Sequence, residues 1–191
     1  MIVEILLEEP SMENFLREVL PKILPADYIL DTNCFLRPHN GKSDLKKSIP
    51  KKIKTFSNYF EPVKVIIIHD QDSNDCKRLK SALLNLCKKN GNCPVLIRIA
   101  CKELESWYLG DMDAIEKVYP KFKAKAFRNM AKFRNPDSVQ ASQELSTIIP
   151  EFQKGYASKN ISKFISIEKN TSASFSHMVT GISKFLTPKL F

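Results

Sequence analysis

The sequence predicts an α/β fold in which a parallel sheet is flanked by helices and a helical C-terminal half packs on that sheet. Two observations predict it. Strand-like and helix-like segments alternate over the first 110 residues, an order typical of parallel sheets with helical connections. The run Val-Ile-Ile-Ile at 65–68 is continuously apolar, as expected for a strand buried on both faces at the centre of such a sheet.

We expect the first strand at residues 2–8. Glu4 interrupts its apolar run and therefore favours a strand near a sheet edge or a solvated end. A helix should follow from Pro10 to about residue 22, with Ser11 as its N-cap and an apolar stripe at helical spacing. The short apolar segment 28–30 is expected to form a second strand.

Residues 33–60 are expected to begin as a loop and to become lysine-rich, and Pro50 should break or restart any helix there. The clearest strand is predicted at 63–69. A helix is expected over 72–90, closed by Gly91 in the position after its C-cap.

A further buried strand is predicted at 95–100, with a helix beginning near Lys102. Beyond Asp111 the strand signal fades, which places an α/β core at 1–111 and a helical extension of the same domain at 112–191. Five helical or partly helical segments are expected in that extension: 114–119, 121–133, 137–148, 152–165 and 174–186.

The composition limits the classes of function. The formal net charge of +9 favours polyanionic partners such as nucleic acid. Apolar runs are too short to span a membrane, and the N-terminus does not resemble a signal peptide, so a cytoplasmic protein is expected. The cysteines are odd in number and form no Cys-x-x-Cys pair, which predicts reduced thiols and no zinc site.

Acidic residues follow the predicted strands at the edge where ligands bind in open α/β sheets. Glu8 and Glu9 follow the first strand, and Asp70 and Asp72 follow the central strand. A third group follows the last strand: Glu103, Glu105 and Asp111.

Two aspartates spaced two apart in an extended chain point the same way, so Asp70 and Asp72 could share one Mg²⁺. Such a cation would remove the repulsion between converging carboxylates and could activate water or polarise a phosphate. The alternative is a turn followed by a helix cap, because Asp72, Ser73 and Asn74 are all favoured cap residues.

Five stretches of the chain resemble the Toprim superfamily, and more narrowly an uncharacterised bacterial Toprim-like family associated with OLD- or ABC-type ATPases. Leu7-Glu8-Glu9-Pro10 resembles the strand that ends in Glu, and Asp70-Gln71-Asp72 resembles the Asp-x-Asp motif. The matching stretches span nearly the whole chain: EEPSMENFL near the start, GKSDL at 41–45, DQDSNDC at 70–76, ACKELESWYLGD at 100–111 and NTSASF at 170–175.

The resemblance implies an acid/base or metal-linked role for Glu8 and Mg²⁺ (or Mn²⁺) ligation by Asp70 and Asp72, with Glu103 or Glu105 as a further catalytic acid. The chain departs from the family pattern at Glu9, which stands where Gly is usual. It also departs at Met12, which stands where relatives carry an acid, and this weakens the case for two metal ions.

Basic and aromatic residues offer supporting roles. The lysine run that includes Lys42, Lys46 and Lys47 could follow a phosphate backbone or form a solvated helix face, and Lys154 could reach a scissile phosphate. A second basic region at 121–134, interleaved with phenylalanines, predicts an amphipathic helix with a basic outer face. Trp107 is expected in the core rather than stacked on a base. His69 is expected to be structural and, if the strand continues, to point to the face opposite Asp70.

Two functions follow from these observations. The first is a Mg²⁺-dependent endonuclease of Toprim type acting on DNA or RNA, which the resemblance links to an antiphage defence system with an ABC/OLD-type ATPase partner. The second is a catalytically inactive or regulatory module that binds such an ATPase through its helical half. A homo-oligomer is compatible with the sequence.

Overall fold

The computed structural model describes residues 1–187 and contains one parallel sheet. Its strands are β1 (Ile2–Leu7), β2 (Cys34–Pro38), β3 (Val63–Asp70) and β4 (Val95–Ala100), in the order β2-β1-β3-β4. All neighbouring strands pair in parallel. The predicted α/β class with a parallel sheet flanked by helices is therefore confirmed.

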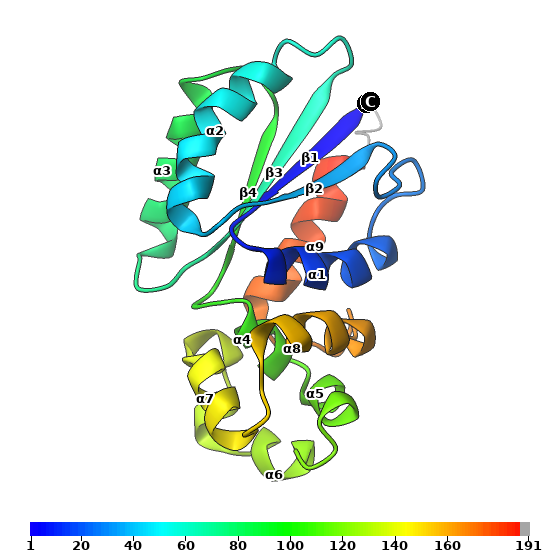
Figure 1. Cartoon of the computed structure of the whole chain (residues 1–191), viewed down its shortest axis with the longest axis vertical. Helices are drawn as coiled ribbons and strands as arrows, with labels where there is room; N and C mark the ends of the chain where they lie inside the picture. The colour runs from blue at the N-terminus through cyan, green and yellow to red at the C-terminus, as the bar shows by residue number, and fades with distance from the viewer. Residues whose placement is uncertain (188–191) are drawn as a thin grey trace.

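Helices cover both faces of the sheet (Figure 1). On one face, α2 (Lys42–Phe56) and α3 (Cys76–Lys88) pack on alternate residues of β3 and β4, including Val65, Ile67 and Ile97. On the other face, α1 (Pro10–Val19) and α9 (Ala173–Leu186) cover the opposite set. The alternation follows from the two-residue period of a strand, and it explains why the apolar run of β3 has no polar break.

The remaining helices gather beyond the carboxyl ends of the strands (Figure 1). They share the α1/α9 core, in which Trp107 is fully buried, lies 5.4 Å from the Phe15 ring and donates from Nε1 to Ser174 Oγ at 2.8 Å. The elements are α4 (Glu105–Leu109), α5 (Met112–Val118), α6 (Ala124–Arg128), α7 (Ala141–Ile148) and α8 (Lys154–Asn160), with 3₁₀ turns at Ala131–Phe133, Pro136–Ser138 and Ser162–Phe164; we call this group the helical extension from here on. A further 3₁₀ turn, Leu20–Lys22, follows α1. Trp107 thus joins the helical extension to the sheet, as expected of a core residue.

The second strand lies later in the chain than predicted. Residues 28–30 form no strand beyond an isolated bridge between Leu30 and Cys34. They lead into a turn at 31–33, where Asn33 Oδ1 accepts from Ile29 N and Asn33 Nδ2 donates to Asp27 O, both at 2.8 Å. Asp31 has a positive φ of 60° in that turn. The strand follows at Cys34, which pairs with Val3. Side-chain hydrogen bonds from one Asn therefore outweigh the strand preference of three apolar residues.

The helices also differ from the predictions in several places. Pro50 lies inside a continuous α2, where burial of Leu45, Ile49 and Ile53 against the sheet offsets the missing backbone hydrogen bond. The N-cap of α1 is Glu9, not Ser11, because Pro10 already occupies the first helical position.

The helix after β3 begins at Cys76, with Asp75 as the N-cap that accepts from Arg78 N at 2.8 Å, so residues 72–75 are a turn. That helix ends in right-handed geometry at Lys89. Gly91 lacks the positive φ expected of a residue closing it. The basic region 121–134 also does not form one amphipathic helix but α6 and a 3₁₀ turn around stacked Phe122 and Phe127 rings.

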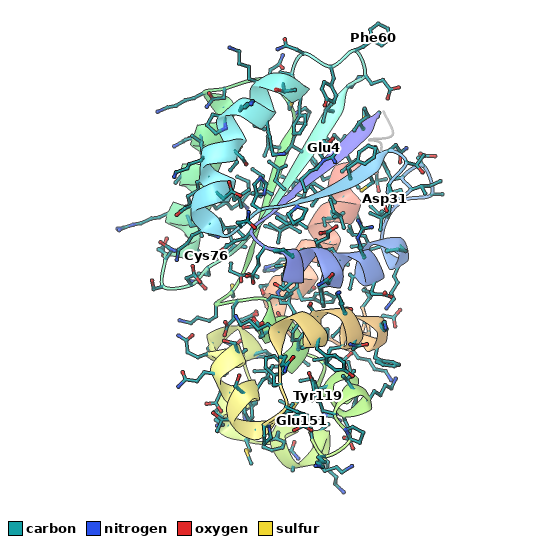
Figure 2. The ribbon with its side chains drawn as sticks, in the orientation of Figure 1. Glu4, Asp31, Phe60, Cys76, Tyr119 and Glu151 are labelled. Atoms are coloured by element: carbon teal, nitrogen blue, oxygen red, sulfur yellow. The ribbon has the colours of Figure 1, made fainter. Side chains whose placement is uncertain are left out.

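The expectation that β1 lies near a sheet edge is wrong. β1 is an inner strand, and Glu4 is only 2% exposed on it (Figure 2). Arg37 on the neighbouring β2 makes the burial tolerable, since its Nε and Nη2 donate to the two Glu4 carboxylate oxygens at 2.8 and 3.1 Å. The ion pair replaces the water that an edge position would have supplied.

All five cysteines carry free thiols, as expected. Within residues 1–187, no helix combines the length and apolar character needed to cross a membrane.

The Glu4–Arg37 pair gives a stability prediction. Arg37→Ala should lower the free energy of unfolding by about 2–3 kcal/mol, because it leaves a buried carboxylate without its partner. The matched control is Arg17→Ala, which removes an exposed arginine paired with Glu13 and Asp31 and should cost under about 1 kcal/mol. Urea denaturation of both variants measures the difference, and equal losses would contradict the assigned role of Arg37.

Candidate functional site

Four carboxylates from three parts of the chain meet beyond the ends of the central strands; we call them the acidic edge. Glu8 and Glu9 directly follow β1, Asp70 is the last residue of β3, and Glu105 opens α4 shortly after β4. The three strands are parallel, so their carboxyl ends lie at one edge, and the topology alone brings these residues together.

Glu8 is held against the end of β3. Its Oε2 accepts from the Asp70 backbone N–H at 3.1 Å and lies 2.9 Å from Nδ1 of His69, which is fully buried. The same Nδ1 also contacts the backbone oxygen of Asp70. Both neighbours of Nδ1 are acceptors, so this nitrogen carries the ring proton. His69 therefore fixes the orientation of Glu8.

Asp70 is the most strongly perturbed acid of this edge. Its side chain is buried and its Oδ1 has no hydrogen-bond partner. Burial raises the pKa of Asp70 well above its usual range, and repulsion from Glu8, Glu105, Glu9 and Asp72 raises it further. A buried carboxyl oxygen without a partner is costly unless a proton or a cation satisfies it.

Glu105 faces the acidic edge from the helical extension. It is 1% exposed, and neither carboxylate oxygen has a hydrogen-bond partner. Burial raises the pKa of Glu105 to about 7, although the ammonium of Lys154, 3.6 Å from Oε1, opposes that rise. Burial in turn lowers the pKa of the half-exposed Lys154, but Glu105 and Glu103 outweigh it, so its pKa lies above the usual value.

The structure places Asp72 differently from the sequence interpretation. β3 ends at Asp70, and Asp72 has a left-handed φ of 53° in the following turn, so the two side chains do not extend from one strand. Asp72 instead accepts from Lys42 Nζ at 2.9 Å. Lys42 lies there because the α2 N-terminus is tied to the first strand, with Gly41 N donating to Glu8 O at 2.8 Å.

Two acids of the third group hold the helical extension together. Glu103 accepts from Ser142 N and Ser142 Oγ, each at 2.8 Å, at the start of α7. Asp111 caps α5 by accepting from Ala114 N and also accepts from Ser166 N at 2.8 Å. These contacts give both residues structural partners, and the catalytic role predicted for Glu103 stays a prediction.

The donor set of the acidic edge suits a hard cation in its chemistry. Asp70 Oδ1 and both Glu105 oxygens are buried carboxylate oxygens without hydrogen-bond partners, and Mg²⁺ prefers oxygen ligands of this kind. In the part of the chain that the structure describes, no three His, Cys, Asp or Glu side chains are arranged closely enough to hold a metal ion. The acidic edge thus offers unsatisfied carboxylate oxygens rather than a closed cage of ligands.

Sequence reasoning missed one residue of the site and misplaced another. The Tyr108 hydroxyl is buried without a partner, and burial, then Glu105 and Asp70, raise the pKa of this phenol. Its position three residues after Glu105 on a helix was a usable signal. His69 was expected to face away from the acids but contacts Glu8. Of the predicted nucleic-acid-binding lysines, Lys154 and Lys42 lie at the site, whereas Lys47 lines a separate groove beside β2.

Comparisons with known proteins give one family match and a similarity to solved structures. The model of one family, Domain of unknown function (DUF4276), matches residues 7–183. No curated protein matches the chain. The solved C-terminal region of the Burkholderia pseudomallei OLD protein is similar over 97% of this chain and 98% of that one, with 13% identity and a TM-score of 0.55. The corresponding region of the Xanthomonas campestris pv. campestris OLD protein gives 12% identity and a TM-score of 0.48, over 96% and 95%.

The pKa of Glu105 predicts how stability depends on pH when no divalent cation is present. The folded-state pKa of about 7 exceeds the ordinary glutamate pKa of 4.5, so the folded protein binds more protons than the unfolded chain between these values. The free energy of unfolding should therefore fall as pH rises from 5 to 8, by roughly 2–3 kcal/mol from this group. Glu105→Gln should remove that part of the slope in urea titrations with EDTA.

The control is Glu151→Gln, which alters an exposed carboxylate at the far end of the helical extension (Figure 2). This variant should keep the wild-type dependence on pH. A Glu105→Gln protein with the full wild-type slope would show that Glu105 does not hold a proton in the folded state.

Proposed function

The chain belongs to the DUF4276 family, a domain of unknown function, and on that premise we propose that it is a Mg²⁺- or Mn²⁺-dependent nuclease of Toprim type that hydrolyses phosphodiester bonds in DNA or RNA. One observation carries the proposal: Asp70 is buried with an unpartnered oxygen beside Glu8 and Glu105, at the ligand-binding edge of a parallel sheet. The likeness to the OLD C-terminal region supports the fold on which this site is built.

In this proposal Asp70 and Glu8 hold the cation, with Asp72 as a further ligand. The cation, when bound, would polarise the phosphate and lower the pKa of an attacking water. His69 keeps the Glu8 carboxylate turned toward Asp70. Lys42 leaves Asp72 for a phosphate oxygen when substrate binds, which frees the Asp72 carboxylate for the cation.

In the same proposal Glu105 transfers a proton, and Lys154 neutralises negative charge on the phosphate. A carboxyl group whose pKa is about 7 can both give and accept a proton near neutral pH, which suits general acid–base catalysis. Lys154 Nζ, within 3.7 Å of Glu103 and Glu105, is placed to neutralise charge on a phosphoryl oxygen at the same edge.

The biological setting is proposed from the resemblance to OLD proteins. An ABC/OLD-type ATPase is the proposed partner, and antiphage defence is the proposed role of the pair. The net charge of +9 supports nucleic acid as the substrate, and the site geometry does not favour DNA over RNA.

A second candidate is a regulatory module that binds the partner ATPase and lacks catalysis. The ion pairs at the acidic edge favour it: Lys42 with Asp72, and Lys154 with Glu103 and Glu105, already neutralise carboxylates without a metal. Within residues 1–187, the absence of a closed group of three ligands favours it as well.

Cleavage assays test the enzyme directly. With Mg²⁺ or Mn²⁺, the wild type should cleave at least one of duplex DNA, single-stranded DNA and bulk tRNA, and Asp70→Asn should lower the rate by at least about a hundredfold. Asp27→Asn, an exposed substitution on the opposite side of the sheet, should retain the wild-type rate. Equal cleavage by wild type and Asp70→Asn would assign the activity to a contaminant.

Calorimetry separates the two candidates without relying on turnover. The enzyme should bind Mg²⁺ or Mn²⁺ with a heat that Asp70→Asn abolishes and Asp27→Asn preserves. A protein that binds neither cation, cleaves no substrate and forms a stable complex with its co-expressed neighbouring ATPase would be the regulatory module.

A further inference from the structure

A basic groove runs along the outer side of the edge strand β4, between α3 and α9; we call it the edge groove. Its volume is about 510 Å³, within the range of sites that enclose small ligands or parts of larger ones. Ile97 and Ile99 of β4 form part of its apolar lining. Its residues come from four separate segments of the chain, which only the fold brings together.

Arg98 is fixed in the wall of the edge groove. Its Nε donates to His177 O at 2.9 Å and its Nη1 donates to Ile97 O at 3.0 Å. Gly181 makes room for it, since a Cβ at that position would lie 1.8 Å from Arg98 Nη2. Burial lowers the pKa of the Arg98 guanidinium, which nevertheless stays charged in proteins. The orientation of this cation is therefore set before any ligand binds.

The other cations of the edge groove are exposed lysines on its two helical walls, Lys77 and Lys80 on α3 and Lys184 on α9. Within residues 1–187, none of these lysines and no atom of Arg98 takes part in a salt bridge. Asp137 is a carboxylate in the lining, and it already accepts hydrogen bonds from Ser172 and Ser174. The groove thus carries uncompensated positive charge.

One end of the edge groove adjoins the acidic edge. Cys76 and Cys101 line that end, and Cys76 lies at the end of α3 that faces the helical extension (Figure 2). Gln71 N donates to Ala100 O and Asp72 N donates to Lys102 O, both at 2.8 Å, so the segments that carry Asp70 and Glu105 meet at this end. A chain lying in the groove would lead toward the candidate catalytic carboxylates.

We propose that the edge groove binds the sugar–phosphate backbone of a nucleic-acid strand and guides it to the acidic edge. The inference rests on the proposed function, for which it names the path of the substrate. Uncompensated lysines on both walls match the repeated charge of phosphodiesters, and the fixed guanidinium can donate to a phosphate oxygen. The lining has no Phe, Tyr or Trp side chain to stack on bases, so binding should depend on salt and little on base sequence.

The groove on the other edge of the sheet fits this role less well. It lies beside β2 and contains Lys47, Lys51 and Lys52, but its arginine, Arg37, is neutralised by the buried Glu4. The lysines of that groove also belong to a single helix, α2, whereas the edge groove carries cations on both walls.

Fluorescence anisotropy in EDTA tests the edge groove without catalysis. A labelled single-stranded oligonucleotide and its duplex serve as separate probes, each titrated at several salt concentrations. The double variant Lys77→Glu/Lys80→Glu should weaken binding of the better probe at least tenfold and reduce the magnitude of the salt slope by about two. Arg98→Gln should weaken it severalfold, with a melting curve to confirm folding.

The charge-matched control is Lys88→Glu/Lys89→Glu, which reverses two exposed lysines at the far end of α3, outside the lining of the groove. Its affinity for the probe should lie within about twofold of the wild-type affinity, and the two proteins should show the same salt slope. The groove proposal would be overturned if both double variants weakened binding of the probe equally, or if the groove variant did not weaken it at all.

Cleavage assays on the same proteins separate the two proposals. If the groove variant binds more weakly but the wild type cleaves nothing with any metal, the groove proposal is supported and the nuclease proposal is rejected. If cleavage depends on Asp70 but not on Lys77 and Lys80, the nuclease proposal is supported and the groove proposal is rejected.

Discussion

The burial of Asp70 at the carboxyl end of β3 is the constraint on which the site depends. Parallel pairing brings the ends of β1, β3 and β4 to one edge, and the side chains that follow them must share that space. Packing of the helical extension then removes the water that would separate Glu8, Asp70 and Glu105. Repulsion in this low-dielectric space favours whatever neutralises it, whether a proton, a lysine or a divalent cation.

The helical extension is part of the site rather than an addition to it. It supplies Glu105 and Tyr108 from α4 and Lys154 from α8, and Trp107 locks α4 to the core shared with α1 and α9. The ion pairs of Lys42 and Lys154 show how the protein keeps clustered acids tolerable without a metal. The same contacts explain why an active nuclease and a regulatory module both suit this geometry.

Much of the fold could be predicted because strong local patterns and tertiary packing agree. The apolar runs of β3 and β4 leave few alternatives to buried parallel strands, and the acids after β1 and β3 follow from their positions in the chain. Predictions failed where a local preference met a competing contact. Asn33 turned residues 28–30 into a loop, packing on the sheet overrode Pro50, and Arg37 allowed Glu4 into an inner strand.

The sequence by itself determined the α/β class, the order of the strong strands and which acids follow them, because these depend on periodicity and on position along the chain. Only the tertiary structure decided which acids meet. It brought Glu105 and Lys154 to the same edge as Glu8 and Asp70, and it paired Glu103 with Ser142 at the start of α7. It also assembled the edge groove from β4, α3 and α9. The reason is physical, since burial, charge pairing and the approach of distant segments arise only when the chain is packed.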